Sequence, residues 1–340
     1  MQMRGGTSKG AYFLARDLPR DPAARDDLLL RIMGAPDERQ IDGLGGGHPL
    51  TSKVAVVAPS DDPDADVDYL FLQVVPDRPI VTDAQTCGNL LAGVGPFAIE
   101  RGLVRPAGDS TEVRIRMMNP SVAFARARVR TTGGRVRYDG DTVMAGTPFP
   151  AAPIDLTFPG GDTLFPTGRL TDRLAGFDVT CVDGGMPVVL ARATDLGLAG
   201  DEPPSALEDD AGLRERVEAL RLAAGFAMGL GDVAEATVPK ISIVSAPRNG
   251  GTIATRTFIP HRVHTAIGVL GAVSVAAAVR TPGTIASADG AGPVRIEHPT
   301  GTFEVAVELD GHRLRESSVV RTARKLSDGL VWPRPVGEAA

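Results

Sequence analysis

The sequence CGNLLAGVGPFAIERGL, residues 87–103, has the pattern of a helix built largely from small residues. Glycine and alanine leave little side-chain bulk, so neighbouring strands can pack closely around such a helix. A second stretch of this kind, VHTAIGVLGAVSVAAAVR, covers residues 263–280. Aligning their central glycines places Cys87 opposite Thr265. The two stretches predict two central helices whose N-termini lie at these two residues.

The flanking sequence repeats in the same order in both halves. RGGTSKGAYFLARDL, residues 4–18, resembles DGGMPVVLARATDLGL, residues 183–198, in its glycine pair, apolar strand and Asp-Leu ending. A lysine then opens a β-branched run, Lys53 in TSKVAVVAP and Lys240 in VPKISIVSAP. Both runs have strand composition and end at a proline. The chain therefore contains an internal repeat.

This repeat predicts an α/β (α+β) fold of two similar domains. Each domain is expected to be a curved sheet wrapped around its small-residue helix, with both helix N-termini facing a shared cleft. The expected boundaries are 1–165 and 166–340, with the segment from about 311 to 340 returning to the first domain. Amphipathic patterns predict further helices at 23–34, ending at Gly34 as a C-cap, and at 211–230.

Composition excludes several classes of function. The net charge is −6 and no basic stripe is present, which argues against a nucleic-acid partner. No apolar run reaches the roughly 18 residues that a membrane-spanning helix needs, and the N-terminus lacks a signal-peptide core. Two cysteines make no disulfide framework. We expect a cytoplasmic protein, with a homodimer as the default oligomer.

The segment MRGGTSKG, residues 3–10, predicts a loop whose backbone N–H groups can surround an anion. It does not fit a phosphate-binding P-loop, because Lys9 is preceded by Ser8 and followed by Gly10. The alternative is a glycine turn with solvated charges.

IDGLGGGHPLTSKVAVV, residues 41–57, contains three consecutive glycines, which are tolerated where backbone approaches another group closely. Thr51 and Ser52 offer hydroxyls beside Lys53. A lysine that enters an apolar strand is often partly buried, and burial in general makes a lysine amine usable as a base near neutral pH. The alternative is a lysine at a strand edge whose amine reaches solvent.

Cys87 precedes a predicted helix, where N–H groups and the helix dipole stabilise a thiolate. Gly88 allows a ligand to approach and Asn89 adds a donor. The alternative is an inert buried thiol, which is our interpretation of Cys181 in the strand pattern FDVTCVDGG. The five histidines form no ligand pattern with cysteines, and no dinucleotide fingerprint follows a strand. We therefore expect no metal and no cofactor.

The motifs MRGGTSKG, IDGLGGGHPLTSKVAVV and CGNLLAGVGPFAIERGLV closely resemble the family that contains 4-oxalomesaconate tautomerase and 2-methylaconitate cis-trans isomerase. Its broader fold is that of diaminopimelate epimerase, two similar domains with the active site between them. The resemblance implies a cofactor-independent isomerase that catalyses a 1,3-allylic proton shift on a small unsaturated polycarboxylate. It favours 4-oxalomesaconate, in gallate- or protocatechuate-type aromatic catabolism.

In that family a lysine and a cysteine 34 positions apart are the proposed proton-transfer pair, and Lys53 and Cys87 have this separation. They are the candidate catalytic residues. The candidate substrate-binding residues are Arg4, Gly5, Gly6, Thr7, Ser8, Thr51, Ser52, Gly88, Asn89, Gly184, Gly185, Met186, His264 and Thr265. Two alternatives are an isomerase of 2-methylaconitate or aconitate and a non-catalytic tricarboxylate-binding relative. Whether Lys53 or Cys87 returns the proton stays open.

Overall fold

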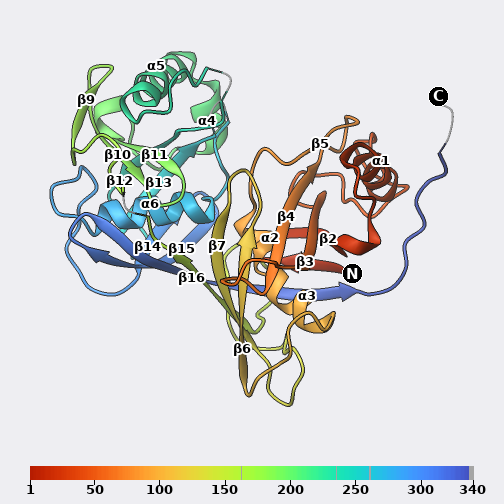
Figure 1. Ribbon diagram of the computed structural model, residues 1–340. Coiled ribbons are helices and arrows are strands. Elements are labelled where there is room, and N and C mark those ends of the chain that lie inside the picture. The colour runs from red at the N-terminus through yellow and green to blue at the C-terminus, as the bar shows by residue number, and fades with distance from the viewer. Residues whose placement is uncertain (162, 235, 260–261, 337–340) are drawn as a thin grey trace. The chain divides into compact units, whose positions relative to one another are not determined.

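A computed structural model describes residues 1–161, 163–234, 236–259 and 262–336. The chain has a mixed α/β fold and forms two compact units (Figure 1). Unit 1 consists of Met1–Thr157 and Val320–Ala340, and unit 2 of Phe158–Val319. Unit 1 is therefore discontinuous in sequence. No helix in the described ranges is both long and apolar enough to cross a membrane.

The elements of unit 1 are mostly strands. Its helices are α1 (Pro22–Met33), α2 (Gly88–Leu91) and α3 (Val94–Glu100), with a 3₁₀ turn at Ala15–Asp17. Its strands are β1 (Gln2–Gly5), β2 (Ser8–Leu14), β3 (Lys53–Pro59), β4 (Val67–Val74), β5 (Val81–Thr82), β6 (Ser110–Met117), β7 (Ala123–Arg130) and most of β8 (Pro153–Pro159). The strand order is β1-β2-β3-β4-β6-β7-β8, and β5 pairs with β4.

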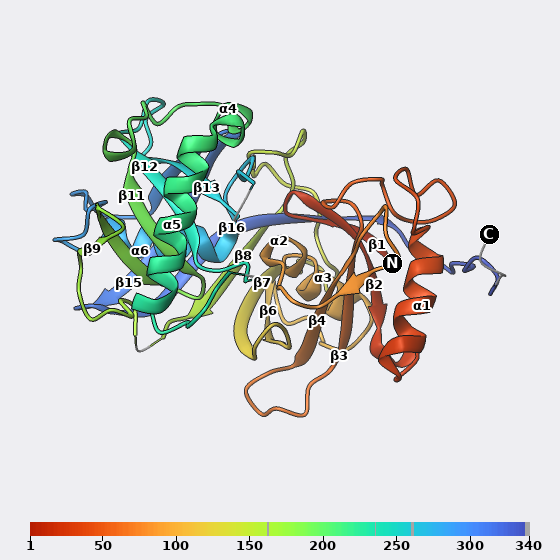
Figure 2. The same ribbon diagram turned by 90° about the horizontal axis from the view of Figure 1, so that it is seen from above.

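Unit 2 repeats this plan with one longer central helix. Its helices are α4 (Pro204–Asp209), α5 (Ala211–Ala227) and α6 (Val269–Val279), with a 3₁₀ turn at Thr194–Leu196. Its strands are β9 (Asp172–Leu174), β10 (Phe177–Asp183), β11 (Pro187–Arg192), β12 (Lys240–Ser245), β13 (Ile253–Phe258), β14 (Val294–His298), β15 (Gly301–Asp310) and the first part of β16 (Arg313–Ser327). Figure 2 shows α5 lying over the strands of its own unit.

Small residues let each central helix pack against several strands. In unit 1, α3 contacts β3, β6 and β7. A Cβ atom on Gly95 would lie 2.9 Å from Val129 Cγ2 and 3.1 Å from Ala127 Cβ, so this position accepts no side chain without a shift. In unit 2, α6 contacts β10, β11, β14 and β15, and every residue from 272 to 279 is buried. Both small-residue stretches are helical, but the one in unit 1 is divided at Ala92 and Gly93 into the short helices α2 and α3.

One predicted helix start is wrong. Helix α6 begins at Val269, with Gly268 as its N-cap, and not at Thr265. The intervening residues form a turn in which the backbone N–H of Ala266 donates to Nδ1 of His264 at 2.9 Å. This local bond replaces the first helical turn, because a side chain that engages nearby backbone competes with helix formation.

Three other sequence predictions concern two helix ends and the burial of Cys181. Helix α1 ends at Gly34, whose φ of 79° is the left-handed C-cap conformation expected for glycine. Helix α5 ends at Ala227 rather than residue 230. Cys181 is fully buried in the core of unit 2, as expected.

Candidate functional site

The three N-terminal motifs meet within unit 1. Gly5 is the last residue of β1 and Gly6 begins the turn of the β1–β2 hairpin, and Asn89 of α2 packs against both. A Cβ atom on Gly5 would lie 2.6 Å from the Asn89 carbonyl oxygen, and one on Gly6 would lie 2.3 Å from Asn89 Oδ1. A Cβ atom on Gly10 would lie 2.6 Å from the carbonyl oxygen of Lys53. These glycines are therefore required for the close approach of the motifs, and Gly6 also has a positive φ of 51°.

Cys87 is the N-cap of α2. Its Sγ accepts the backbone N–H of Leu90 at 3.5 Å, and the thiol is partly buried. Two fully buried tyrosines hold the surrounding backbone, since Tyr69 donates to the Cys87 carbonyl and Tyr12 to the Leu90 carbonyl. Burial raises the pKa of Tyr12 and of Tyr69 well above the usual value, and the nearby Cys87 adds to both rises. Both phenols therefore act as neutral donors that fix the first turn of α2.

Two buried hydroxyls of unit 1 have no hydrogen-bond partner in the described part of the chain. They are Ser8 Oγ, at the start of β2, and Thr86 Oγ1, directly before Cys87. Buried hydroxyls without a partner are rare, because removing them from water costs free energy that no protein contact returns. A polar ligand would satisfy them. Ser8 belongs to the predicted substrate-binding residues, whereas Thr86 is an addition that only the structure provides.

Lys53 lies at the start of β3 and is only 6% exposed. Its Nζ donates to Gln73 Oε1 at 2.7 Å and lies 4.9 Å from the centroid of the Phe71 ring. The Gln73 amide donates in turn to the carbonyls of Ser52 and Pro49. The amine is thus held by one neutral acceptor. Sequence analysis did not identify Gln73, although a glutamine inside the apolar strand YLFLQVV was an available signal.

Other predicted residues of unit 1 are engaged in internal bonds. Ser52 is fully buried, and its hydroxyl accepts from Gln40 Nε2 at 2.7 Å. Thr51 donates to the His48 carbonyl. Arg4 donates to the Gly6 carbonyl and to the carbonyl and hydroxyl of Thr322. The residues that surround Cys87 are therefore mainly those of the hairpin tip and α2.

The predicted residues of unit 2 lie in two places. Gly184, Gly185 and Met186 form the turn between β10 and β11. The Gly184 N–H donates to Ser274 Oγ at 2.9 Å, and that hydroxyl donates to the Met186 carbonyl at 2.7 Å, which holds the turn against the middle of α6. His264 and Thr265 precede α6, and the Thr265 carbonyl accepts from Thr300.

Lys240, the repeat counterpart of Lys53, gives a pH-dependent prediction. Burial, together with the Arg221 guanidinium, lowers the pKa of Lys240 to about 8, from 10.5. Between these values the unfolded chain holds the proton and the folded chain does not, so the free energy of unfolding rises with pH. Urea unfolding measures this: from pH 7.5 to pH 9.5, the free energy of unfolding of wild type should rise relative to that of Lys240→Met. If the difference in free energy between the two proteins is the same at both pH values, the lowered pKa of Lys240 is contradicted.

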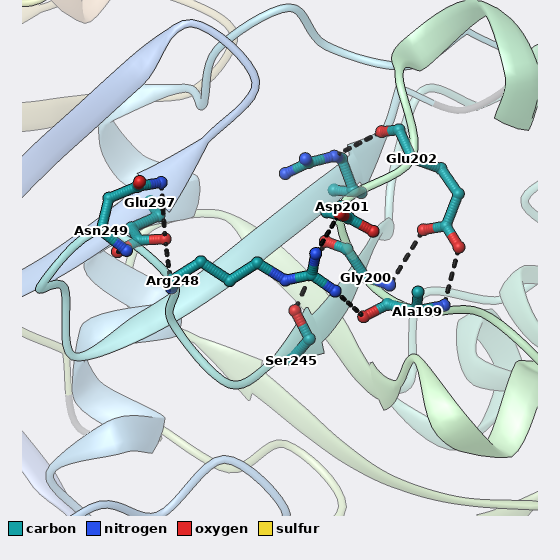
Figure 3. A network of polar contacts seen from close by, with 9 residues as sticks. Ala199, Gly200, Asp201, Glu202, Ser245, Arg248, Asn249 and Glu297 are labelled. Atoms are coloured by element: carbon teal, nitrogen blue, oxygen red, sulfur yellow. Dashed lines mark hydrogen bonds and ion pairs between the residues drawn. The ribbon is translucent and has the colours of Figure 1, made fainter.

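A second polar cluster lies in unit 2 (Figure 3). The carboxylate of Glu297 accepts three backbone N–H groups of the β12–β13 loop at 2.6–2.9 Å, and that of Glu202 accepts two at 2.7 and 2.9 Å. Burial acts to raise the pKa of Glu297, but the backbone donors outweigh it and lower that pKa. Arg248 pairs with Asp201. Because both carboxylates accept hydrogen bonds from backbone N–H groups, we interpret the cluster as one that holds the neighbouring loops in place.

In the described residues, no group of three or more His, Cys, Asp or Glu side chains is arranged to hold a metal ion.

Comparison with known proteins agrees with the motifs. The family model described as PrpF protein matches residues 1–334. The chain is 53% identical to a (4E)-oxalomesaconate Delta-isomerase of Novosphingobium sp. (strain KA1), over 98% of this chain and 96% of that protein. It is 53% identical to a 4-oxalomesaconate tautomerase of Pseudomonas putida, over 97% of this chain and 94% of that protein.

A solved structure, that of a methylitaconate-delta-isomerase, superposes with a TM-score of 0.86 at 32% identity. The superposition covers 96% of this chain and 93% of that one. Sequence family and fold therefore agree over nearly the full length. The chain belongs to the PrpF family and is an isomerase.

Proposed function

We propose that this isomerase catalyses a 1,3-allylic proton shift on 4-oxalomesaconate. The observation that carries the substrate assignment is the identity of 53% to two relatives named for that acid. The composition of unit 1 supports the chemistry, because the motifs that converge there supply a basic side chain, a thiol and the unpartnered Ser8 hydroxyl, and Thr86 adds a second such hydroxyl directly before Cys87. The proposal includes the finer fold expected from the sequence, a sheet wrapped around a central helix in each unit.

In the proposed mechanism, Lys53 as the neutral amine removes a proton from the allylic carbon. The electron pair left behind delocalises over the three-carbon unit and the adjoining carbonyl as a dienolate. The backbone N–H groups of Gly88 and Asn89 are the proposed donors to the developing negative charge. A proton then adds to the other end of the three-carbon unit, which restores a neutral carbon skeleton with the double bond moved.

Gln73 sets the geometry of the base in this scheme. Its carbonyl oxygen accepts one N–H of Lys53, which orients the amine. The same nitrogen lies over the face of the Phe71 ring, 4.9 Å from its centroid. Contacts from Gly184, Gly185, Met186, His264 and Thr265 to the substrate stay predictions of the sequence.

The test is proton NMR in D₂O with purified protein and 4-oxalomesaconate in its keto form. We expect isomerisation with solvent deuterium entering one carbon. In Cys87→Ala, hydrogen–deuterium exchange that continues without isomerisation would assign the second proton transfer to Cys87. Isomerisation that continues in Cys87→Ala would assign both transfers to Lys53.

Aconitate and 2-methylaconitate serve as comparison substrates. Turnover of these acids with none of 4-oxalomesaconate would retain the mechanism and replace the substrate. Absence of exchange with all of them, combined with tight binding of a tricarboxylate, would favour a non-catalytic acid-binding protein and contradict the proposal.

A further inference from the structure

Three cationic residues stand side by side across neighbouring strands of unit 1. Arg4 on β1 pairs in register with Lys9 on β2 and with Arg324 on β16. Residues directly opposite each other in antiparallel strands project on the same face, and like charges in that arrangement destabilise the sheet. A row of three positive charges therefore needs a group that offsets their mutual repulsion.

The charges of Arg4 and Arg324 are not neutralised by carboxylates. In the part of the chain that the structure describes, Arg4 bonds only to carbonyl and hydroxyl oxygens, of Gly6 and Thr322, and Arg324 makes no ion pair. Arg4 is half-buried, and burial together with Arg324 lowers its pKa. The two guanidiniums therefore repel each other at a site where an anion would relieve the repulsion.

A pocket of about 370 Å³ opens beside this pair. Arg4 and Arg324 line it together with Phe149, which is 66% exposed, and Leu326, which is 47% exposed. The remaining lining residues are Thr147, Pro148, Pro150 and Lys325. Lys325 is already paired with Glu100 at 2.7 Å. The pocket therefore combines apolar walls with two guanidiniums that have no carboxylate partner among the described residues.

This pocket is separate from the groups around Cys87. Successive side chains of a strand project to opposite faces. A Cβ atom on Gly5 would point toward the backbone of Asn89 and Leu90, so the side chain of the neighbouring Arg4 projects to the opposite face of β1. Arg4 is the one member of the predicted substrate-binding residues among those that line the pocket.

We propose that the pocket binds a small carboxylate with a flat, apolar body. The carboxylate would lie between the Arg4 and Arg324 guanidiniums, each of which presents a planar fork of donors suited to it. The apolar body would pack against Phe149 and the flanking prolines. The volume lies within the range of small-molecule sites, and such sites combine apolar walls with a few charged or polar groups.

Benzoate is the probe, with benzamide as its uncharged counterpart of the same shape. Isothermal titration of the full-length protein should show benzoate binding and no benzamide binding. Arg324→Gln should weaken benzoate binding by about tenfold or more, since it removes one charge-assisted contact. Phe149→Ala should also weaken it. Arg130→Gln, at an exposed position on β7, is the matched control and should bind benzoate as wild type does.

Other outcomes of these titrations would contradict the proposed carboxylate site. Equal binding of benzamide and benzoate, or unchanged binding in Arg324→Gln, overturns the proposal. If inorganic phosphate binds at the Arg324 site and benzoate does not, the proposal that the ligand has an apolar body is overturned. Benzoate binding lost in Ser8→Ala but kept in Arg324→Gln would place the anion beside Cys87. That last result would overturn the new site and leave the proposed isomerase activity intact.

Discussion

Lys53→Ala should lower kcat by between about 10² and 10⁴-fold, the range that a positioned general base contributes. The reason is that Lys53 is only 6% exposed and its amine is held by one neutral acceptor, Gln73, so water has little access to replace it. Substrate binding should change much less, because the carboxylate contacts proposed for the substrate come from other residues. Steady-state kinetics with 4-oxalomesaconate would separate the two parameters.

Lys240→Met provides a matched control for this experiment. Lys240 occupies the corresponding strand position in unit 2 and is partly buried, so removing its charge tests whether loss of a strand-opening lysine by itself reduces activity. We expect kcat within about twofold of wild type, since the proposed mechanism gives Lys240 no contact with the substrate. A Lys53→Ala protein that is folded and retains more than a tenth of wild-type kcat would exclude Lys53 as the base.

Arg221→Ala should lower the free energy of unfolding by about 3–5 kcal/mol, the usual effect of removing one partner from a buried ionic network. Arg221 on α5 is fully buried. Its guanidinium pairs with both oxygens of Glu218 and donates to four backbone carbonyls of the following loop, those of Val233, Ala234, Ala236 and Val238. Alanine would leave these carbonyls and the Glu218 carboxylate without their donor.

Urea unfolding followed by circular dichroism measures this loss. Arg216→Ala, at an exposed position on the same helix, should change the free energy by about 0.5 kcal/mol or less. Arg221→Lys should recover part of the stability, because one ammonium cannot reach every acceptor of the guanidinium fork. Equal effects of Arg221→Ala and Arg216→Ala would show that the network adds nothing to stability.

Sequence analysis predicted those features that depend on local pattern. The glycines of the β1–β2 hairpin, the N-cap position of Cys87 and the small-residue character of both central helices all follow from residue type and spacing. The repeat also placed Lys53 and Lys240 at the starts of corresponding strands. These features need no knowledge of which distant residues come into contact.

The features that sequence analysis missed depend on contacts between distant segments. Gln73 meets Lys53 because β3 and β4 pair in a register that places them opposite each other. Tyr12 and Tyr69 reach α2 from two separate strands. The start of α6 moved from Thr265 to Val269 because His264 bonds locally to backbone, which the helical pattern of the sequence does not reveal.

The pairing of the first and last strands has a consequence for the order in which the protein is completed during synthesis. Unit 2 is one continuous segment, so all of it has been made before the final residues are added. Residues of β1, by contrast, pair with Ala323, Arg324, Lys325 and Ser327. Domains made first usually fold first on the ribosome. Here the unit that carries Lys53 and Cys87 is begun first, and β1 gains its partner β16 only after all of unit 2 has been made.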